Sequence, residues 1–115
     1  MKHVTYAEKS LLMDDEAADS LLEYARVLAL ASRADTVSVR AIGSDGNTVD
    51  AAFLLNEASI MIVESTNSTV EAPDNREAVQ YMQERIDRLR NPRGAEAEEE
   101  GDLLRHGDID LPGSP

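Results

Sequence analysis

The sequence contains no cysteine and no tryptophan, and it has few aromatic residues and few histidines. Without cysteine the chain can form no disulfide and no thiolate metal site, and it has no thiol nucleophile. The only histidines, His3 and His106, lie near the two ends of the chain, and neither stands in a pattern typical of nucleophilic catalysis. These absences weigh against an enzyme, and we expect no catalytic residue, bound metal or cofactor.

Positive charge is also scarce, since 23 acidic residues stand against 11 basic ones and the net charge is -12. Nucleic acids and anionic membranes are bound through clustered lysine and arginine, so we expect neither as a partner. No apolar run approaches the roughly 20 residues of a membrane span, and residues 1–13 do not resemble a signal peptide. Together with the absence of cysteine, this predicts a cytoplasmic protein.

Glycine is too sparse to form a phosphate-binding loop, because none of the six glycines falls in a GxGxxG or GxxxxGK pattern. Gly43 and Gly46 instead belong to a hairpin turn, for which the pair Asp45-Gly46 is a typical signal. The turn joins residues 36–42 and 48–55, which alternate apolar and polar side chains as half-buried strands do.

Two further segments have strand character. Residues 60–63 are apolar on both faces, so we expect this strand inside the sheet and not at its edge. Residues 2–13 predict another hairpin, or alternatively a backward extension of the first helix.

Two amphipathic stretches predict helices near residues 15–33 and 75–90. Asp14 or Asp15 can cap the first, and Asp74 can cap the second with Glu77 as its reciprocal partner. The sequence therefore predicts an α+β domain over residues 1–92, with an antiparallel sheet in the order ββαβββα packed against two helices.

The end of the first helix lacks a polar face. Residues 27–31 are apolar on all sides, and such a turn is normally covered on all sides. The second helix or a second copy of the chain in a homodimer could provide this cover. We therefore take Val27, Leu30 and Ala31 as candidate partner contacts.

Residues 93–115 form an acidic tail with two bases and seven acids, a net charge of -5. Its first part is too polar to offset the entropy of ordering. A short apolar segment follows at residues 103–111, with Leu103, Leu104, Ile109 and Leu111 as further candidate partner contacts. This segment could bind a partner, fold back onto its own domain or stay disordered.

These patterns favour a non-enzymatic protein-interaction or adaptor module with a protein partner. One alternative is a small-molecule-binding or enzymatic domain with a pocket between helix and sheet, with Tyr24, Tyr81, Arg40 or Glu64 as polar groups. Another is an acidic inhibitor or antitoxin that imitates nucleic acid. The last requires acids spread over one rigid face, whereas much of the excess charge lies in the tail.

Overall fold

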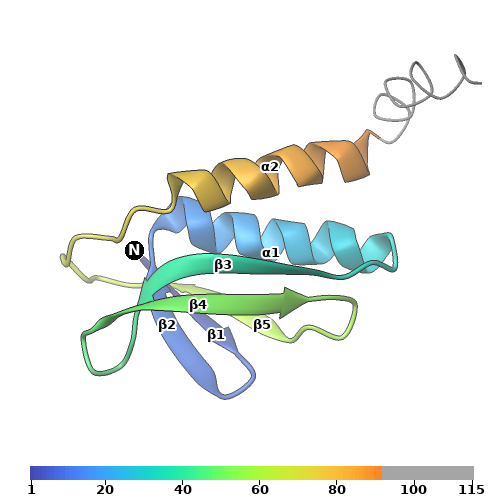
Figure 1. The fold of residues 1–115 in the computed structure, drawn as a ribbon. Coiled ribbons are helices and arrows are strands. Elements are labelled where there is room, and N and C mark those ends of the chain that lie inside the picture. The colour runs from blue at the N-terminus through green and yellow to red at the C-terminus, as the bar shows by residue number, and fades with distance from the viewer. Residues whose placement is uncertain (92–115) are drawn as a thin grey trace, which may run out of the picture.

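The computed structural model describes residues 1–91, whose elements follow the order ββαβββα (Figure 1). They are β1 (Lys2–Tyr6), β2 (Lys9–Met13), α1 (Asp15–Leu30), β3 (Asp35–Ile42), β4 (Thr48–Leu55), β5 (Met61–Ser65) and α2 (Arg76–Arg90). The predicted α+β fold class and element order are confirmed. The predicted tail contacts Leu103, Leu104, Ile109 and Leu111 lie outside the described residues.

The five strands form one antiparallel sheet in the order β4-β3-β2-β1-β5. Residues 2–13 form the predicted hairpin and not a helical extension, with Val4 opposite Leu11. The β3–β4 hairpin is also present, and Gly46 in its turn has a φ of 86°, a conformation that glycine adopts without strain.

The prediction that residues 60–63 lie inside the sheet is wrong. β5 pairs only with β1 and forms an edge of the sheet. Ile60 and Ile62 are 75% and 54% exposed, whereas Met61 and Val63 on the other face are half-buried. This strand is therefore covered on one face only, although its residues are apolar on both faces.

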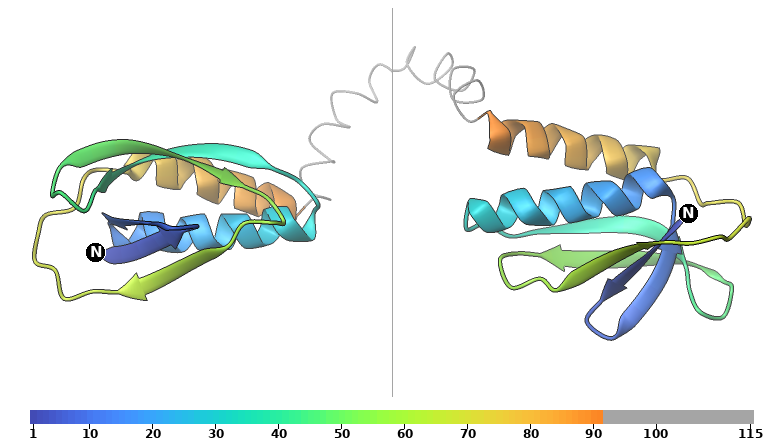
Figure 2. Two further views of the ribbon diagram at one scale, coloured as in Figure 1. Left: turned by 90° about the horizontal axis from the view of Figure 1, so that it is seen from below. Right: turned by 180° about the vertical axis from the view of Figure 1, so that it is seen from behind.

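Both helices lie on the same face of the sheet and run in the same direction (Figure 1). Seen from below in Figure 2, β3 and β4 lie on one side of α1 and β5 on the other, so the sheet curves around this helix. The core lies between these layers and is mainly aliphatic; its buried members include Val4, Met13, Leu21, Tyr24, Val37, Val39, Phe53, Leu55, Met82 and Ile86. Within residues 1–91 nothing covers the opposite face of the sheet.

The N-terminus of α1 is capped as predicted, because Asp14 Oδ2 accepts a hydrogen bond from the Ala17 N–H at 3.0 Å. The predicted cap of α2 is wrong. Asn75 is the N-cap residue, and its side chain makes no hydrogen bond to the helix. Asp74 Oδ1 instead accepts from the Arg76 N–H at 3.0 Å. The Asn75 side chain is directed toward β3, which matters for the site described below.

The apolar turn at residues 27–31 is only partly covered. Val27 is buried, whereas Leu30 is 75% exposed and Ala31 is exposed. The helix stops at Leu30, short of residue 33, because Ser32 adopts a left-handed conformation with a φ of 53° and the Arg33 N–H bonds back to the Leu28 carbonyl. This bond is typical of a Schellman C-cap. It leaves Leu30 at the surface.

Candidate functional site

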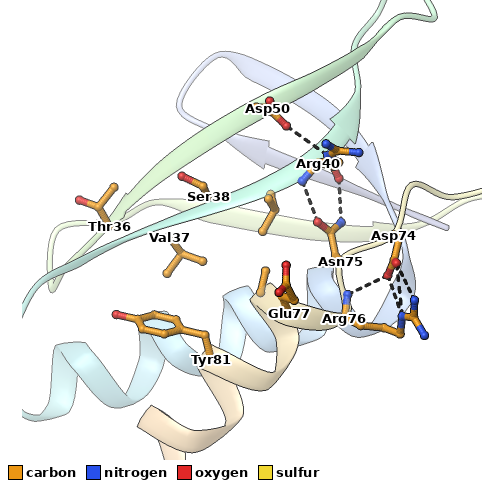
Figure 3. Close-up of a pocket in the computed structure, with 12 residues that line it drawn as sticks. Thr36, Val37, Ser38, Arg40, Asp50, Asp74, Asn75, Arg76, Glu77 and Tyr81 are labelled. Carbon is orange, nitrogen blue, oxygen red and sulfur yellow. Dashed lines mark hydrogen bonds and ion pairs between the residues drawn. The ribbon is translucent and has the colours of Figure 1, made fainter.

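A groove of about 450 Å³ runs between β3 and the first half of α2 (Figure 3). One wall is the strand segment at residues 36–40. The other wall carries Asp74, Glu77, Ala78 and Tyr81, which are spaced three and four residues apart and so share one side of the helix start. The groove therefore lies between the edge of a strand and one face of a helix.

The strand wall of the groove is an unpaired edge. β2 pairs with β3 only at Leu12–Ile42, and the two strands then diverge. The next outward-pointing residue, Arg40, bonds to the Asn75 side chain, with its N–H 2.7 Å from Oδ1 and its carbonyl oxygen 2.8 Å from Nδ2. The side-chain amide thus replaces the peptide group of a neighbouring strand.

Ser38 continues this edge. In an antiparallel pair, residues two apart point their backbone groups to the same side, so the Ser38 N–H and carbonyl point where those of Arg40 do. Within residues 1–91 neither group has a hydrogen-bond partner. The Thr36 carbonyl has the same orientation, whereas the Thr36 N–H bonds to Asp35 Oδ1 at 2.8 Å. An unpaired edge of this kind is a template for another strand.

Asn75 holds the groove in place. Its side chain is buried, with 6% of the residue exposed, and its Nδ2 also donates to Asp14 Oδ1 at 3.0 Å. One amide therefore connects β3, the cap of α1 and the start of α2, as Figure 3 shows for the Arg40 bonds. Because all its donors and its acceptor oxygen are used, the position of α2 relative to β3 is fixed at this point.

The charges around the groove are mostly matched. Arg40 lies 3.4 Å from Asp50, and Arg76 lies 2.9 Å from Asp74. Glu77 has no ion-pair partner among the described residues. The groove is therefore left with one unmatched negative charge.

Tyr81, at the far end of the groove, is held by a network of polar groups. Its hydroxyl donates to Asp35 Oδ2 at 2.6 Å, and the Tyr24 hydroxyl donates to the same oxygen. Arg85 Nε donates to the Tyr24 hydroxyl at 3.0 Å, and its guanidinium lies 5.5 Å from the centre of the Tyr81 ring. The network joins α1, β3 and α2, and it fixes the ring that borders the groove.

The pKa values in this network follow from the same contacts. Burial and then the hydrogen bond to Asp35 raise the pKa of Tyr24 above its ordinary value. The hydrogen bond to Asp35, and then burial, raise the pKa of Tyr81. Burial alone would raise the pKa of Asp35, but the hydrogen bonds from the two tyrosine hydroxyls and the Thr36 N–H, together with the charge of Arg85, lower that pKa overall. At neutral pH the carboxylate is charged and both hydroxyls are occupied, so the network positions side chains and offers no free acid or base.

The structure brings together some of the predicted polar groups. Arg40 and Tyr81 both line the groove, and Tyr24 holds Tyr81 through Asp35. Glu64 lies away from them, exposed on edge strand β5 and opposite His3 of β1.

Asn75, Asp35 and Ser38 were missed by the sequence interpretation. The sequence around Asn75 does not indicate a functional role, since an asparagine after Pro73-Asp74 is equally typical of a turn or a helix cap.

In the part of the chain that the structure describes, no three histidine or carboxylate side chains gather closely enough to hold a metal ion. The same part contains no helix of the length and hydrophobicity needed to traverse a bilayer. No protein-family model matches the sequence, and comparison with curated proteins and with solved structures gives no match either.

Proposed function

We propose that the protein is a non-enzymatic interaction module that takes up an extended segment of a partner protein along β3, in the groove beside α2. The observation that carries the proposal is the unpaired N–H and carbonyl of Ser38 at the wall of this groove. A peptide that adds to a sheet edge gains its affinity from main-chain hydrogen bonds and its specificity from pockets for alternate side chains.

The groove supplies both kinds of contact. Ser38 and the Thr36 carbonyl offer backbone groups, and Asn75 shows that an amide fits against this edge at the neighbouring position. Ala78 and Tyr81 offer an apolar surface to side chains that point toward α2. Since Tyr81 is already held by Asp35 and Arg85, little ordering of this surface is needed on binding.

A pair of proline variants tests the proposal. Ser38 and Ala52 face each other across the β3–β4 ladder, and their N–H groups point away from that ladder to opposite sides. Ser38→Pro removes the donor at the groove, whereas Ala52→Pro removes an equivalent donor at the outer edge of β4. Proline imposes the same backbone restriction at both positions, so each serves as the control for the other.

The assay is a random-peptide selection on the full-length wild-type protein, followed by binding measurements on both variants after their folding is checked by circular dichroism. We expect selected peptides to shift the backbone amide NMR signals of residues 36–40, to bind the Ala52 variant and to lose binding to the Ser38 variant. Equal effects of the two prolines would rule out the groove as a peptide site. So would failure to select any peptide both on the wild type and on the tail variant Leu103→Asp/Arg105→Asp/Ile109→Asp/Leu111→Asp.

The predicted homodimer stays a prediction. The exposure of Leu30 at the end of α1 favours a contact there, and replacement of Leu30 by serine would test it.

A further inference from the structure

We propose that the segment accepted by this groove is cationic, with a lysine or arginine placed one residue away from the position opposite Ser38. This inference rests on the proposed function and names the class of partner that the groove fits. It follows from the charges around the groove, from the alternation of side chains along a strand and from the spacing of two residues on α2.

The charge argument begins with the arginines. Arg40, Arg76 and Arg85, which border the groove or its aromatic wall, each lie within 4 Å of a carboxylate, at 3.4, 2.9 and 3.7 Å. None is left to attract an anionic peptide. The carboxylate of Glu77, in contrast, has no ion-pair partner among residues 1–91. With a net charge of -12 on the whole chain, the surrounding potential also favours an approaching cation.

The position of the cation follows from strand geometry. Successive side chains of a strand point to opposite faces, so the residue opposite Ser38 directs its side chain to the uncovered face of the sheet. Its two neighbours point to the other face, toward α2. Figure 3 shows Glu77 and Tyr81 on α2, across the groove from β3.

The spacing of Glu77 and Tyr81 on α2 matches the spacing of the two peptide residues that flank the one opposite Ser38. Glu77 and Tyr81 are four residues apart, which is about 6 Å along a helix axis. The neighbours are two residues apart, which is about 6.6 Å along a strand. Because residues 36–40 of β3 and the side chains of Glu77 and Tyr81 line opposite sides of the same groove (Figure 3), one neighbour can meet Tyr81 and the other Glu77. We therefore infer a segment with an apolar side chain at the first position and a lysine or arginine at the second.

One stretch of the chain's own tail, Leu103-Leu104-Arg105, has an apolar side chain and an arginine two residues apart. It lies in acidic sequence, however, with five acids among residues 96–102 before it and Asp108 and Asp110 after it. A tail in the groove would bring carboxylates toward Glu77, where like charges repel. The charge pattern thus favours a separate partner over the tail.

The test uses the full-length protein and three synthetic heptapeptides with blocked ends and the sequence Thr-Val-Thr-X-Thr-Val-Thr, in which X is lysine, glutamine or glutamate and shares one face of the strand with the two valines. We expect the lysine peptide to bind about fivefold or more tightly than the glutamate peptide at low ionic strength, with a smaller ratio at high salt because screening weakens exposed pairs. NMR titration locates binding through the amides of residues 36–40. Glu77→Gln should reduce the ratio, whereas Glu84→Gln, two turns further along the same side of α2, should leave it unchanged.

Each outcome separates the two proposals. Equal binding of all three peptides at residues 36–40, abolished by Ser38→Pro, would overturn the cationic preference and leave the groove as a peptide site. If none of the three peptides binds, the proposal that the groove is a peptide site is refuted, with one exception. If the variant Leu103→Asp/Arg105→Asp/Ile109→Asp/Leu111→Asp gains binding that the wild type lacks, the tail occupies the groove and the inference of a cationic partner is wrong.

Discussion

Replacement of Asn75 by alanine tests whether this one side chain holds the fold together at the start of α2. The wild-type amide accepts a bond from the Arg40 N–H and donates bonds to the Arg40 carbonyl and the Asp14 carboxylate. A neutral hydrogen bond contributes about 0.5–1.5 kcal/mol net, and one to a charged group contributes about 1.5–3 kcal/mol. Water can reach Asp14, which is only half-buried, so part of the loss is recovered.

We therefore expect Asn75→Ala to lower the free energy of unfolding by about 3 kcal/mol, which corresponds to a fall in Tm of about 12–24 °C for a domain of this size. Asn75→Asp should be more damaging at neutral pH, although it preserves the shape of the side chain. It replaces the donating amide with a second carboxylate that faces the acceptor oxygens of Asp14 and Arg40.

Urea unfolding of the full-length protein, followed by circular dichroism, measures these differences. Asn67, exposed in the loop before α2, provides the matched control, since Asn67→Ala should change the free energy of unfolding by no more than about 0.5 kcal/mol. A loss below about 1 kcal/mol for Asn75→Ala, or wild-type stability for Asn75→Asp, would show that the amide does not connect the three elements.

Other parts of the structure give further expectations. Tyr24→Phe should lower the free energy of unfolding by about 2 kcal/mol and Tyr81→Phe by about 1 kcal/mol, because Tyr24 is buried and Tyr81 is 39% exposed; equal losses in urea unfolding would contradict this order. The pKa of Asp35 is lowered in the folded state. Ionisation of Asp35 therefore stabilises the protein at pH values above its pKa in the unfolded chain, about 3.9. This contribution is lost as the pH falls through the lower pKa of the folded state. Asp35→Asn should remove that part of the acid dependence, and an unchanged curve of stability against pH would argue against the network. Leu28→Ala should cost about 3 kcal/mol, since Leu28 is buried. Leu30→Ser should cost under about 0.5 kcal/mol in the monomer, but it should abolish a homodimer formed through residues 27–31; light scattering that finds the wild type monomeric would refute that homodimer.

Features that depend on neighbouring residues could be predicted from the sequence. The cap at Asp14 and the turn at Asp45-Gly46 are examples, because each is decided by hydrogen bonds and backbone angles within a few residues. In the structure Asp14 accepts from the Ala17 N–H, and Asp45 Oδ1 accepts from the Asn47 N–H at 3.0 Å.

The choice of strand partners could not be predicted in this way. An apolar run such as residues 60–63 fits an interior strand and an edge strand with an exposed outer face equally well. Its pairing with β1 is decided by segments far apart in the sequence, on which local periodicity carries no information.

The candidate site was predictable only in part. Tyr24, Tyr81 and Arg40 stood out as polar side chains on apolar elements. Asp35 and Asn75 did not, because the start of a strand and the start of a helix already give each a local explanation. Their real partners come from other elements and become visible only in three dimensions.

Asn75 also limits how long a bound segment can be. A bound strand that pairs with β3 from the start of β3 onward reaches the Asn75 side chain at Arg40. There the side-chain amide already bonds the Arg40 N–H and carbonyl. Only the stretch beside Thr36 and Ser38 remains, which accommodates about four or five residues at about 3.3 Å each. A ladder this short provides few hydrogen bonds, so we expect its complexes to dissociate quickly. It also fixes the register, since a segment displaced by two residues toward Arg40 would collide with the amide.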